Sequence, residues 1–183
     1  RRYQLTPSKD GKETGRLISA VTEDGKLVEG TLLSRGSSTL VVVGGGFTHY
    51  REKMALLGDV FNNYDVLFFD YRGHKYQKVK WYDPRTWRLL EINPRETHLG
   101  LSEEKDVYAI VTHACKQKKY QSVVGVGVCY SGLILSKAAA LHPHLFTKLI
   151  LDGCWFSLRD AVEILVKDPG MLARPQSHSK LHN

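Results

Sequence analysis

The chain has 183 residues, of which 42% are hydrophobic and 25% are charged, and its formal net charge at pH 7 is +7. This balance is typical of one soluble globular domain, and no apolar run approaches the roughly 20 residues of a membrane-spanning helix. The three cysteines lack the spacing of a metal site or a disulfide framework. We therefore expect no transmembrane helix, no metal, no cofactor and a reducing, cytoplasmic location.

The first part of the chain predicts an arm followed by a β-hairpin. Residues 1–15 are polar and contain the turn-rich stretch TPSKDG, so we expect an N-terminal arm. Two β-rich runs then flank Asp24-Gly25, a dipeptide typical of hairpin turns. The apolar run TLVVV at 39–43 predicts a buried strand, and the next stretch predicts a helix over 48–63. The apolar residues on one face of this helix are Met54, Leu57 and Phe61.

A strand at 64–70, YDVLFFD, leads into a basic and aromatic excursion over 71–100. Between 71 and 92, tyrosines and tryptophans alternate with basic residues, namely Arg72, Lys75, Lys78, Lys80, Arg85 and Arg88. Such a stretch can bind an acidic ligand, pack on the domain as a surface loop or shape a substrate entrance. Because no nucleic-acid fold signature accompanies it, we expect a packed surface loop and no nucleic-acid partner.

The second half alternates between helices and strands. The clearest helix covers 102–119, with Ser102 as its N-cap and acidic residues in its first turn. Its apolar positions have helical spacing, at Val107, Ile110, Val111 and Ala114. A strand at 122–128, a helix at 131–142, a strand at 147–153 and a helix at 157–168 follow.

These elements predict an α/β fold. Strands without polar alternation are buried on both faces, as in a parallel sheet. We therefore expect a core over 16–168 with a mostly parallel sheet, an N-terminal β-hairpin and helices on both faces. The remaining residues, 169–183, form a tail or the start of a cap segment.

The carboxyl ends of three strands carry candidate site residues. The glycine loop at 44–49 can hold an anion or form a tight turn before a helix. Asp70 is expected to bond loop backbone, a common role for aspartate in turns.

The third strand end, VVGVGVCYSG, fits a nucleophile elbow at Cys129. An elbow needs a strand, a sharp strained turn and a helix, with small residues around the nucleophile. The small residues here are Gly127, Ser131 and Gly132. The alternative is a buried cysteine that acts as a small hydrophobic residue. A dinucleotide-binding loop is disfavoured, because its third glycine would fall on Tyr130.

Six stretches in order resemble the α/β-hydrolase superfamily, above all its small esterases, lysophospholipases and acyl-peptidase-like members. They are EDGKLVEGTLL, VVVGGGFTHYREKM, YDVLFFDYRGH, LGLSEEKDVYAIV, VVGVGVCYSG and TKLILDG, and the resemblance covers roughly residues 17–153. The resemblance implies Cys129 as nucleophile and the backbone N–H groups of Phe47 and Tyr130 as the oxyanion hole. It also implies hydrolysis of an ester, thioester or amide in a small-molecule or lipid-like acyl substrate, without a cofactor.

Two departures from the family pattern leave alternatives open. Most members carry serine at the elbow, whereas cysteine resembles the dienelactone-hydrolase branch. The family's acid and histidine follow later strands, and here the late candidates are Asp160 or Asp168 for the acid and His178 or His182 for the histidine, of which we take Asp160 and His178. We therefore expect a fold that is incomplete at its C-terminus. The chain is then either a piece of a longer hydrolase or an inactive hydrolase-fold binding protein.

Overall fold

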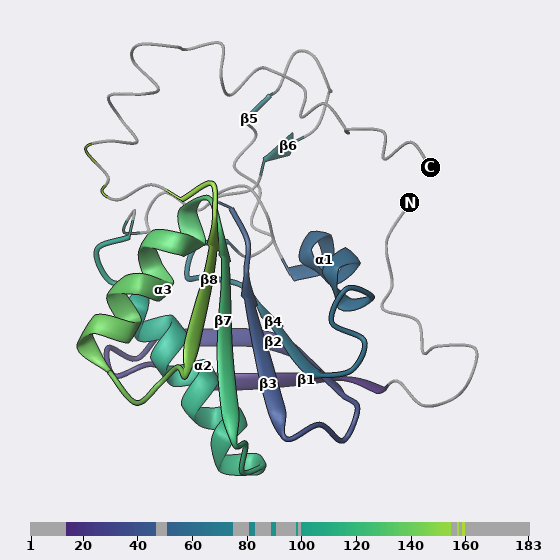
Figure 1. Cartoon of the computed structure of the whole chain (residues 1–183). Coiled ribbons are helices and arrows are strands. Elements are labelled where there is room, and N and C mark those ends of the chain that lie inside the picture. The colour runs from purple at the N-terminus through teal and green to yellow at the C-terminus, as the bar shows by residue number, and fades with distance from the viewer. Residues whose placement is uncertain are drawn as a thin grey trace.

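The structure is a computed structural model that describes residues 14–46, 51–74, 81–82, 89–90, 98, 100–154, 157 and 159. Its main sheet has six strands in the order β1-β2-β4-β3-β7-β8 (Figure 1). The strands are β1 (Thr14–Val21), β2 (Leu27–Ser34), β3 (Thr39–Gly44), β4 (Asp65–Phe69), β7 (Ser122–Val128) and β8 (Lys148–Asp152). Strands β2, β3 and β4 carry mainly buried residues, as continuous apolar runs predict, whereas β7 is partly buried and β8 is largely exposed.

Strand pairing confirms a mostly parallel sheet with an N-terminal hairpin. The strands β1 and β2 are antiparallel and meet at a turn where Gly25 has a φ of 76° and Lys26 N–H donates to Thr22 Oγ1 at 2.8 Å. Strand β2 also pairs antiparallel with β4. Strand β3 pairs parallel with both β4 and β7, and β7 pairs parallel with β8.

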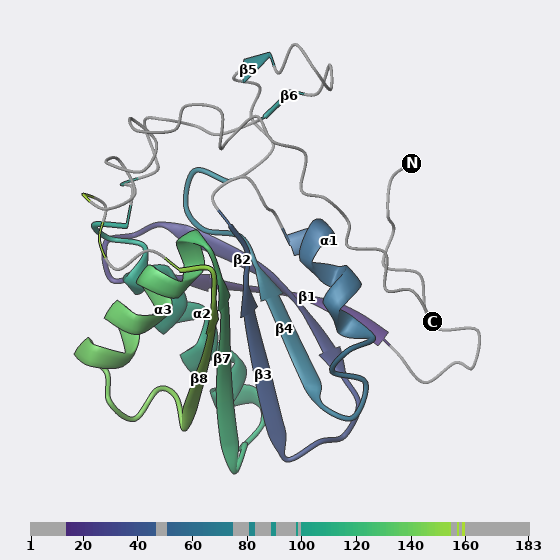
Figure 2. The same ribbon diagram turned by 45° about the horizontal axis from the view of Figure 1, so that its top comes forward.

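Helices cover both faces of the sheet, as predicted. Helices α2 (Glu104–Gln117) and α3 (Tyr130–Leu141) lie on one face, and the short helix α1 (Arg51–Met54) lies on the other (Figures 1 and 2). The four predicted apolar positions of α2 are fully buried, namely Val107, Ile110, Val111 and Ala114. Together with side chains of β1–β4 and α3 they form the larger of two hydrophobic clusters.

The helix predicted over 48–63 is wrong in extent. Within the described residues, α1 ends at Met54 and continues as one turn of 3₁₀ helix, η1 (Ala55–Gly58). The apolar face survives, because Met54, Leu57 and Phe61 contribute to the second hydrophobic cluster.

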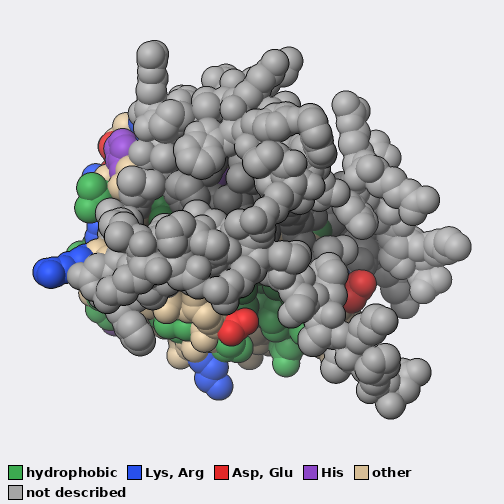
Figure 3. Space-filling model, turned by 90° about the horizontal axis from the view of Figure 1, so that it is seen from above, with side chains coloured by type: hydrophobic (Ala, Val, Ile, Leu, Met, Phe, Trp, Pro, Cys, Tyr) green, Lys and Arg blue, Asp and Glu red, His purple; other side chains and the backbone are tan. Residues whose placement is uncertain are grey.

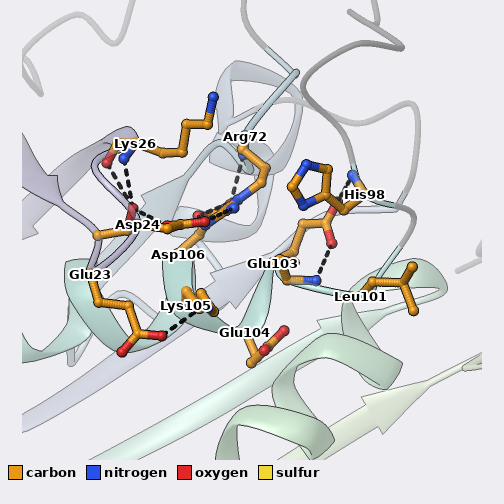
Figure 4. A network of polar contacts seen from close by, with 12 residues as sticks. Glu23, Asp24, Lys26, Arg72, His98, Leu101, Glu103, Glu104, Lys105 and Asp106 are labelled. Carbon is orange, nitrogen blue, oxygen red and sulfur yellow. Dashed lines mark hydrogen bonds and ion pairs between the residues drawn. The ribbon is translucent and has the colours of Figure 1, made fainter.

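The predicted N-cap of α2 is also wrong. Ser102 is not the cap residue; the cap is Glu103, whose fully buried carboxylate accepts hydrogen bonds from three backbone N–H groups. These donors are His98 at 2.6 Å, Gly100 at 2.8 Å and Ser102 at 3.2 Å. The longer glutamate side chain reaches back over the preceding loop and fixes it to the start of the helix (Figure 4).

Arg72 corrects the interpretation of the basic excursion, because this residue is 4% exposed. Its guanidinium donates to Asp106 Oδ1 from Nε at 2.9 Å and from Nη2 at 2.7 Å. It also donates to Asp24 from Nη1 at 2.5 Å and from Nη2 at 3.0 Å (Figure 4). The Arg72 hydrogen bonds hold the pKa of Asp24 well below its usual range. Arg72 therefore ties the end of β4 to the hairpin turn and to α2, and it is not available to an external ligand.

Further along the excursion, β5 (Trp81–Tyr82) and β6 (Leu89–Leu90) pair antiparallel in a separate two-stranded sheet. The other basic residues of the excursion lie outside the described residues, and so does most of the predicted helix over 157–168. Acidic-ligand binding there stays a prediction. Among the described residues, no helix is long and apolar enough to cross a membrane.

Candidate functional site

The candidate site lies where β3, β4, β7 and β8 end, at the upper edge of the sheet in Figure 1. The register pairs Gly44 with Gly127 and Val128 with Asp152. The glycine loop after β3 and the elbow after β7 therefore leave the sheet side by side. Figure 3 views the molecule from this end. The coloured side chains visible there are hydrophobic groups with isolated acidic and basic ones among them.

Cys129 occupies a strained turn between β7 and α3. Its φ is 55° and its ψ is −115°, and among the described residues it is the one non-glycine with positive φ. Its N–H donates to Asp152 O at 2.9 Å, and its own carbonyl accepts the N–H of Gly132 at 3.1 Å. These two hydrogen bonds, to β8 and within α3, hold Cys129 in a backbone conformation that L-residues avoid.

The small residues around Cys129 have a visible steric reason. A Cβ at Gly127 would lie 2.9 Å from both Cα and N of Gly132, so β7 and α3 cross too closely for a side chain. A Cβ at Gly132 would overlap with the side chain of Cys154. The sequence pattern thus reflects close packing of the strand, the helix and the chain after β8.

Ser131 connects the elbow to the glycine loop. Its hydroxyl donates to Gly45 O and accepts a hydrogen bond from the Tyr71 hydroxyl at 3.0 Å. Burial raises the pKa of Tyr71 well above its ordinary value, so the phenol stays protonated as a donor. A Cβ at Gly44 would lie 2.6 Å from Ser131 Oγ, so this connection also requires the glycine. Sequence reasoning placed Tyr71 in the excursion and missed its role here.

His74 packs against the elbow through aromatic contacts. Its ring centroid lies 5.7 Å from that of Tyr71 and 6.0 Å from that of Tyr130, the residue after Cys129. Burial lowers the pKa of His74 to about 4, so the imidazole is neutral at neutral pH. The sequence indicated only that this histidine follows a strand end.

Asp70 has the structural role that the sequence predicts. Its Oδ1 accepts the backbone N–H of Arg51 at 2.8 Å, and its Oδ2 lies 3.3 Å from Arg51 Nη1. Asp70 therefore anchors the start of α1 at the end of β4 and is occupied by this contact.

Three predicted site residues, Phe47, Asp160 and His178, lie outside the described residues. The structure thus brings together Gly127, Cys129, Tyr130, Ser131 and Gly132, and it leaves the predicted acid, base and second oxyanion donor as predictions. In the described part of the chain, no group of three or more His, Cys, Asp or Glu side chains has the arrangement of a metal site.

Solved structures share this fold. An esterase of Pyrococcus furiosus superposes with a TM-score of 0.66 and 19% identity, over 90% of this chain and 62% of that one. An esterase of Rhodococcus gives a TM-score of 0.54 and 20% identity, over 75% of this chain and 46% of that one. An esterase of Exiguobacterium antarcticum gives a TM-score of 0.54 and 18% identity, over 82% of this chain and 55% of that one.

The chain thus spans about half to three-fifths of the length of these esterases. No curated protein sequence matches it. The profile of the family described as alpha/beta hydrolase fold matches residues 39–176, which include β3, the elbow and β8. The chain therefore belongs to the α/β-hydrolase family.

Proposed function

We propose that this chain carries the nucleophile and oxyanion parts of an ester hydrolase, with Cys129 as the nucleophile. The observation that carries the proposal is the left-handed turn at Cys129, with φ of 55°, between a buried parallel strand and the first turn of a helix. A strained residue of this kind needs a compensating use, and presenting a nucleophile above the sheet is one. The similar esterases support an ester as the substrate class.

The proposed chemistry is acyl transfer to water in two steps. The Cys129 thiolate attacks the ester carbonyl carbon, and the carbonyl electron pair moves onto oxygen to give a tetrahedral intermediate. The intermediate collapses, the alcohol leaves with a proton, and an acyl-thioester remains on Cys129. Water then attacks the thioester carbonyl to give a second tetrahedral intermediate, which collapses to the carboxylic acid and the thiol of Cys129.

Backbone groups would stabilise the oxyanion of both intermediates. The N–H of Tyr130 belongs to the first residue of α3, the end of a helix that favours negative charge. With the N–H of Phe47 from the glycine loop it would form a two-donor oxyanion hole. The Ser131 hydrogen bond to Gly45 O supports this assignment, because it ties the loop to the helix that carries Tyr130.

The reaction also needs a base within hydrogen-bond reach of the thiol, and an acid that orients it. The sequence candidates are His178 and Asp160, which we retain as the proposed base and acid. The acyl substrate is proposed to be a small or lipid-like ester, for which lysophospholipids are one instance.

Hydrolysis of a series of p-nitrophenyl esters by the wild type, Cys129→Ala and Cys129→Ser tests the proposal. We expect Cys129→Ala to lose turnover, because the acyl group then has no acceptor. The matched control is Cys115→Ser, which alters a partly buried thiol on α2. It should keep wild-type turnover. Equal turnover in all four proteins would refute the assignment of Cys129.

A further inference from the structure

A second thiol lies beneath the elbow. Cys154 follows β8, and its Sγ lies 3.4 Å from Gly127 O and 3.3 Å from Asp152 O, within hydrogen-bonding distance of a thiol. Its side chain fills the space that a side chain at Gly132 would otherwise occupy. Cys154 therefore packs against the first turn of α3, and it follows β8, the neighbour of the strand β7 that precedes Cys129.

One carbonyl oxygen connects the two cysteines. Asp152 O accepts the N–H of Cys129 at 2.9 Å and lies 3.3 Å from Cys154 Sγ. Val128 and Asp152 are aligned Cα partners in the parallel pair of β7 and β8. Cys129 follows Val128 by one residue, and Cys154 follows Asp152 by two. Neighbouring strands lie about 4.8 Å apart, and disulfides join Cα atoms about 4.4–6.8 Å apart. The aligned positions that the two cysteines follow are therefore spaced within the range of disulfide-linked residues.

Electrostatics agree with this proximity. Burial raises the pKa of Cys154, and the neighbouring Cys129 thiol raises it further. Cys154 thus remains a protonated thiol at neutral pH. Both cysteines are partly exposed, so neither is sealed in the core.

We propose that Cys129 and Cys154 form a reversible redox pair, in which peroxide converts the elbow thiol into a disulfide with the thiol beneath it. In the first step, the Cys129 thiolate attacks hydrogen peroxide, the O–O bond breaks, and a sulfenic acid and hydroxide form. In the second step, the Cys154 sulfur attacks the sulfenic sulfur, an S–S bond forms, and water leaves with the Cys154 proton. Two electrons pass from the thiols to the peroxide, and a dithiol reductant reverses the reaction.

The disulfide would remove the nucleophile and protect it from irreversible oxidation. This inference rests on the contacts of the two cysteines and not on ester hydrolysis. Its test therefore reads out covalent bonds, and its result is independent of any turnover measurement.

Peptide mapping gives a direct test, because trypsin places each cysteine on its own peptide. The peptides cover residues 106–116, 120–137 and 149–159, and they contain Cys115, Cys129 and Cys154, respectively. After treatment of the folded chain with hydrogen peroxide, we expect a linked pair of 120–137 and 149–159 that dithiothreitol separates. Linkage through Cys115, or sulfinic acid at Cys129 with Cys154 still a thiol, would overturn the proposal.

Variants make the test specific. Cys154→Ser replaces the thiol with a group of similar size, and peroxide should then leave a sulfenic acid on Cys129 that dimedone traps. Cys115→Ser is the matched control and should form the disulfide as readily as the wild type. If Cys154→Ser yields the same Cys129 products as the wild type, Cys154 does not act on Cys129 and the proposal fails. Circular dichroism of each variant confirms that the fold persists.

Discussion

The hydroxyl of Tyr71 donates a hydrogen bond to the buried hydroxyl of Ser131 at 3.0 Å, and Ser131 in turn donates to the carbonyl of Gly45. This chain of two bonds joins three segments of the candidate site: the end of β4, the start of α3 and the glycine loop. The position of the loop therefore depends on a tyrosine at the end of β4.

Tyr71→Phe should lower the free energy of unfolding by about 1 kcal/mol, because it removes one buried hydrogen bond. It should also reduce the turnover of an ester substrate, since the glycine loop loses its fixed position. Urea unfolding measures the first effect and steady-state kinetics the second.

Tyr120→Phe is a matched control for this prediction. The Tyr120 hydroxyl donates to Asp65 Oδ2 at 2.9 Å, at the opposite end of β4. Its loss should lower stability to a similar extent and leave turnover unchanged. If both variants lose turnover equally, Tyr71 has only a general structural role.

His74 gives the stability of the fold a dependence on pH. Burial lowers its pKa from 6.5 to about 4. Below pH 6.5 the unfolded chain binds a proton that the folded chain does not, so stability is lost as the pH falls toward 4. The expected loss is about 2 kcal/mol between neutral pH and pH 5.

His74→Gln, which carries no titratable ring, isolates this effect. Urea unfolding at neutral pH and at pH 5 should show a smaller loss in His74→Gln than in the wild type. Parallel losses in the two proteins would show that His74 is not the source.

Arg72 should be far more important to stability than its place in a basic stretch suggests. Arg72→Met leaves Asp106, which is fully buried, without the guanidinium that donates to it. Removal of one partner from a buried pair costs about 3–5 kcal/mol. Asp24 is partly exposed, and Asp24→Asn should cost about 1 kcal/mol or less.

A double variant distinguishes unpaired charge from lost packing. Arg72→Met with Asp106→Leu removes both charges and should recover part of the stability in urea unfolding. The account is contradicted if Asp24→Asn is as destabilising as Arg72→Met, or if the double variant is less stable than Arg72→Met alone.

The contact between Gly132 and Cys154 predicts a rescue. Gly132→Ala should destabilise the fold, because its methyl group would overlap with the Cys154 side chain. Cys154→Gly removes that side chain, so the double variant should be more stable than Gly132→Ala alone. Thermal unfolding of the four proteins measures the coupling, and simple additivity of the two changes would show that the side chains do not meet.

The sequence predicted what local patterns determine. Asp24-Gly25 specifies a hairpin turn over a few residues, and β-branched apolar runs specify the parallel strands that follow. The turn at Cys129 was predictable for the same reason, because Gly127 and Gly132 flank it closely in sequence and leave room for β7 and α3 to cross at short distance.

The sequence could not predict contacts between residues far apart in the chain. Arg72 and Asp106 are separated by 34 positions, and Tyr71 and Ser131 by 60. Nothing near Arg72 distinguishes a buried arginine from the exposed basic residues expected beside it. Cys154 likewise follows an ordinary strand, and only the fold brings it beneath the elbow.

Covalent trapping of an acyl group on Cys129 tests the proposed function most directly. The chain is mixed with p-nitrophenyl acetate, quenched in acid and digested, and the peptide over 120–137 is sequenced by tandem mass spectrometry. We predict an acetyl thioester on Cys129 in the wild type and an unmodified peptide in Cys129→Ala. A burst of p-nitrophenol without acetyl on Cys129, or acetylation that persists in Cys129→Ala, would contradict Cys129 as the nucleophile.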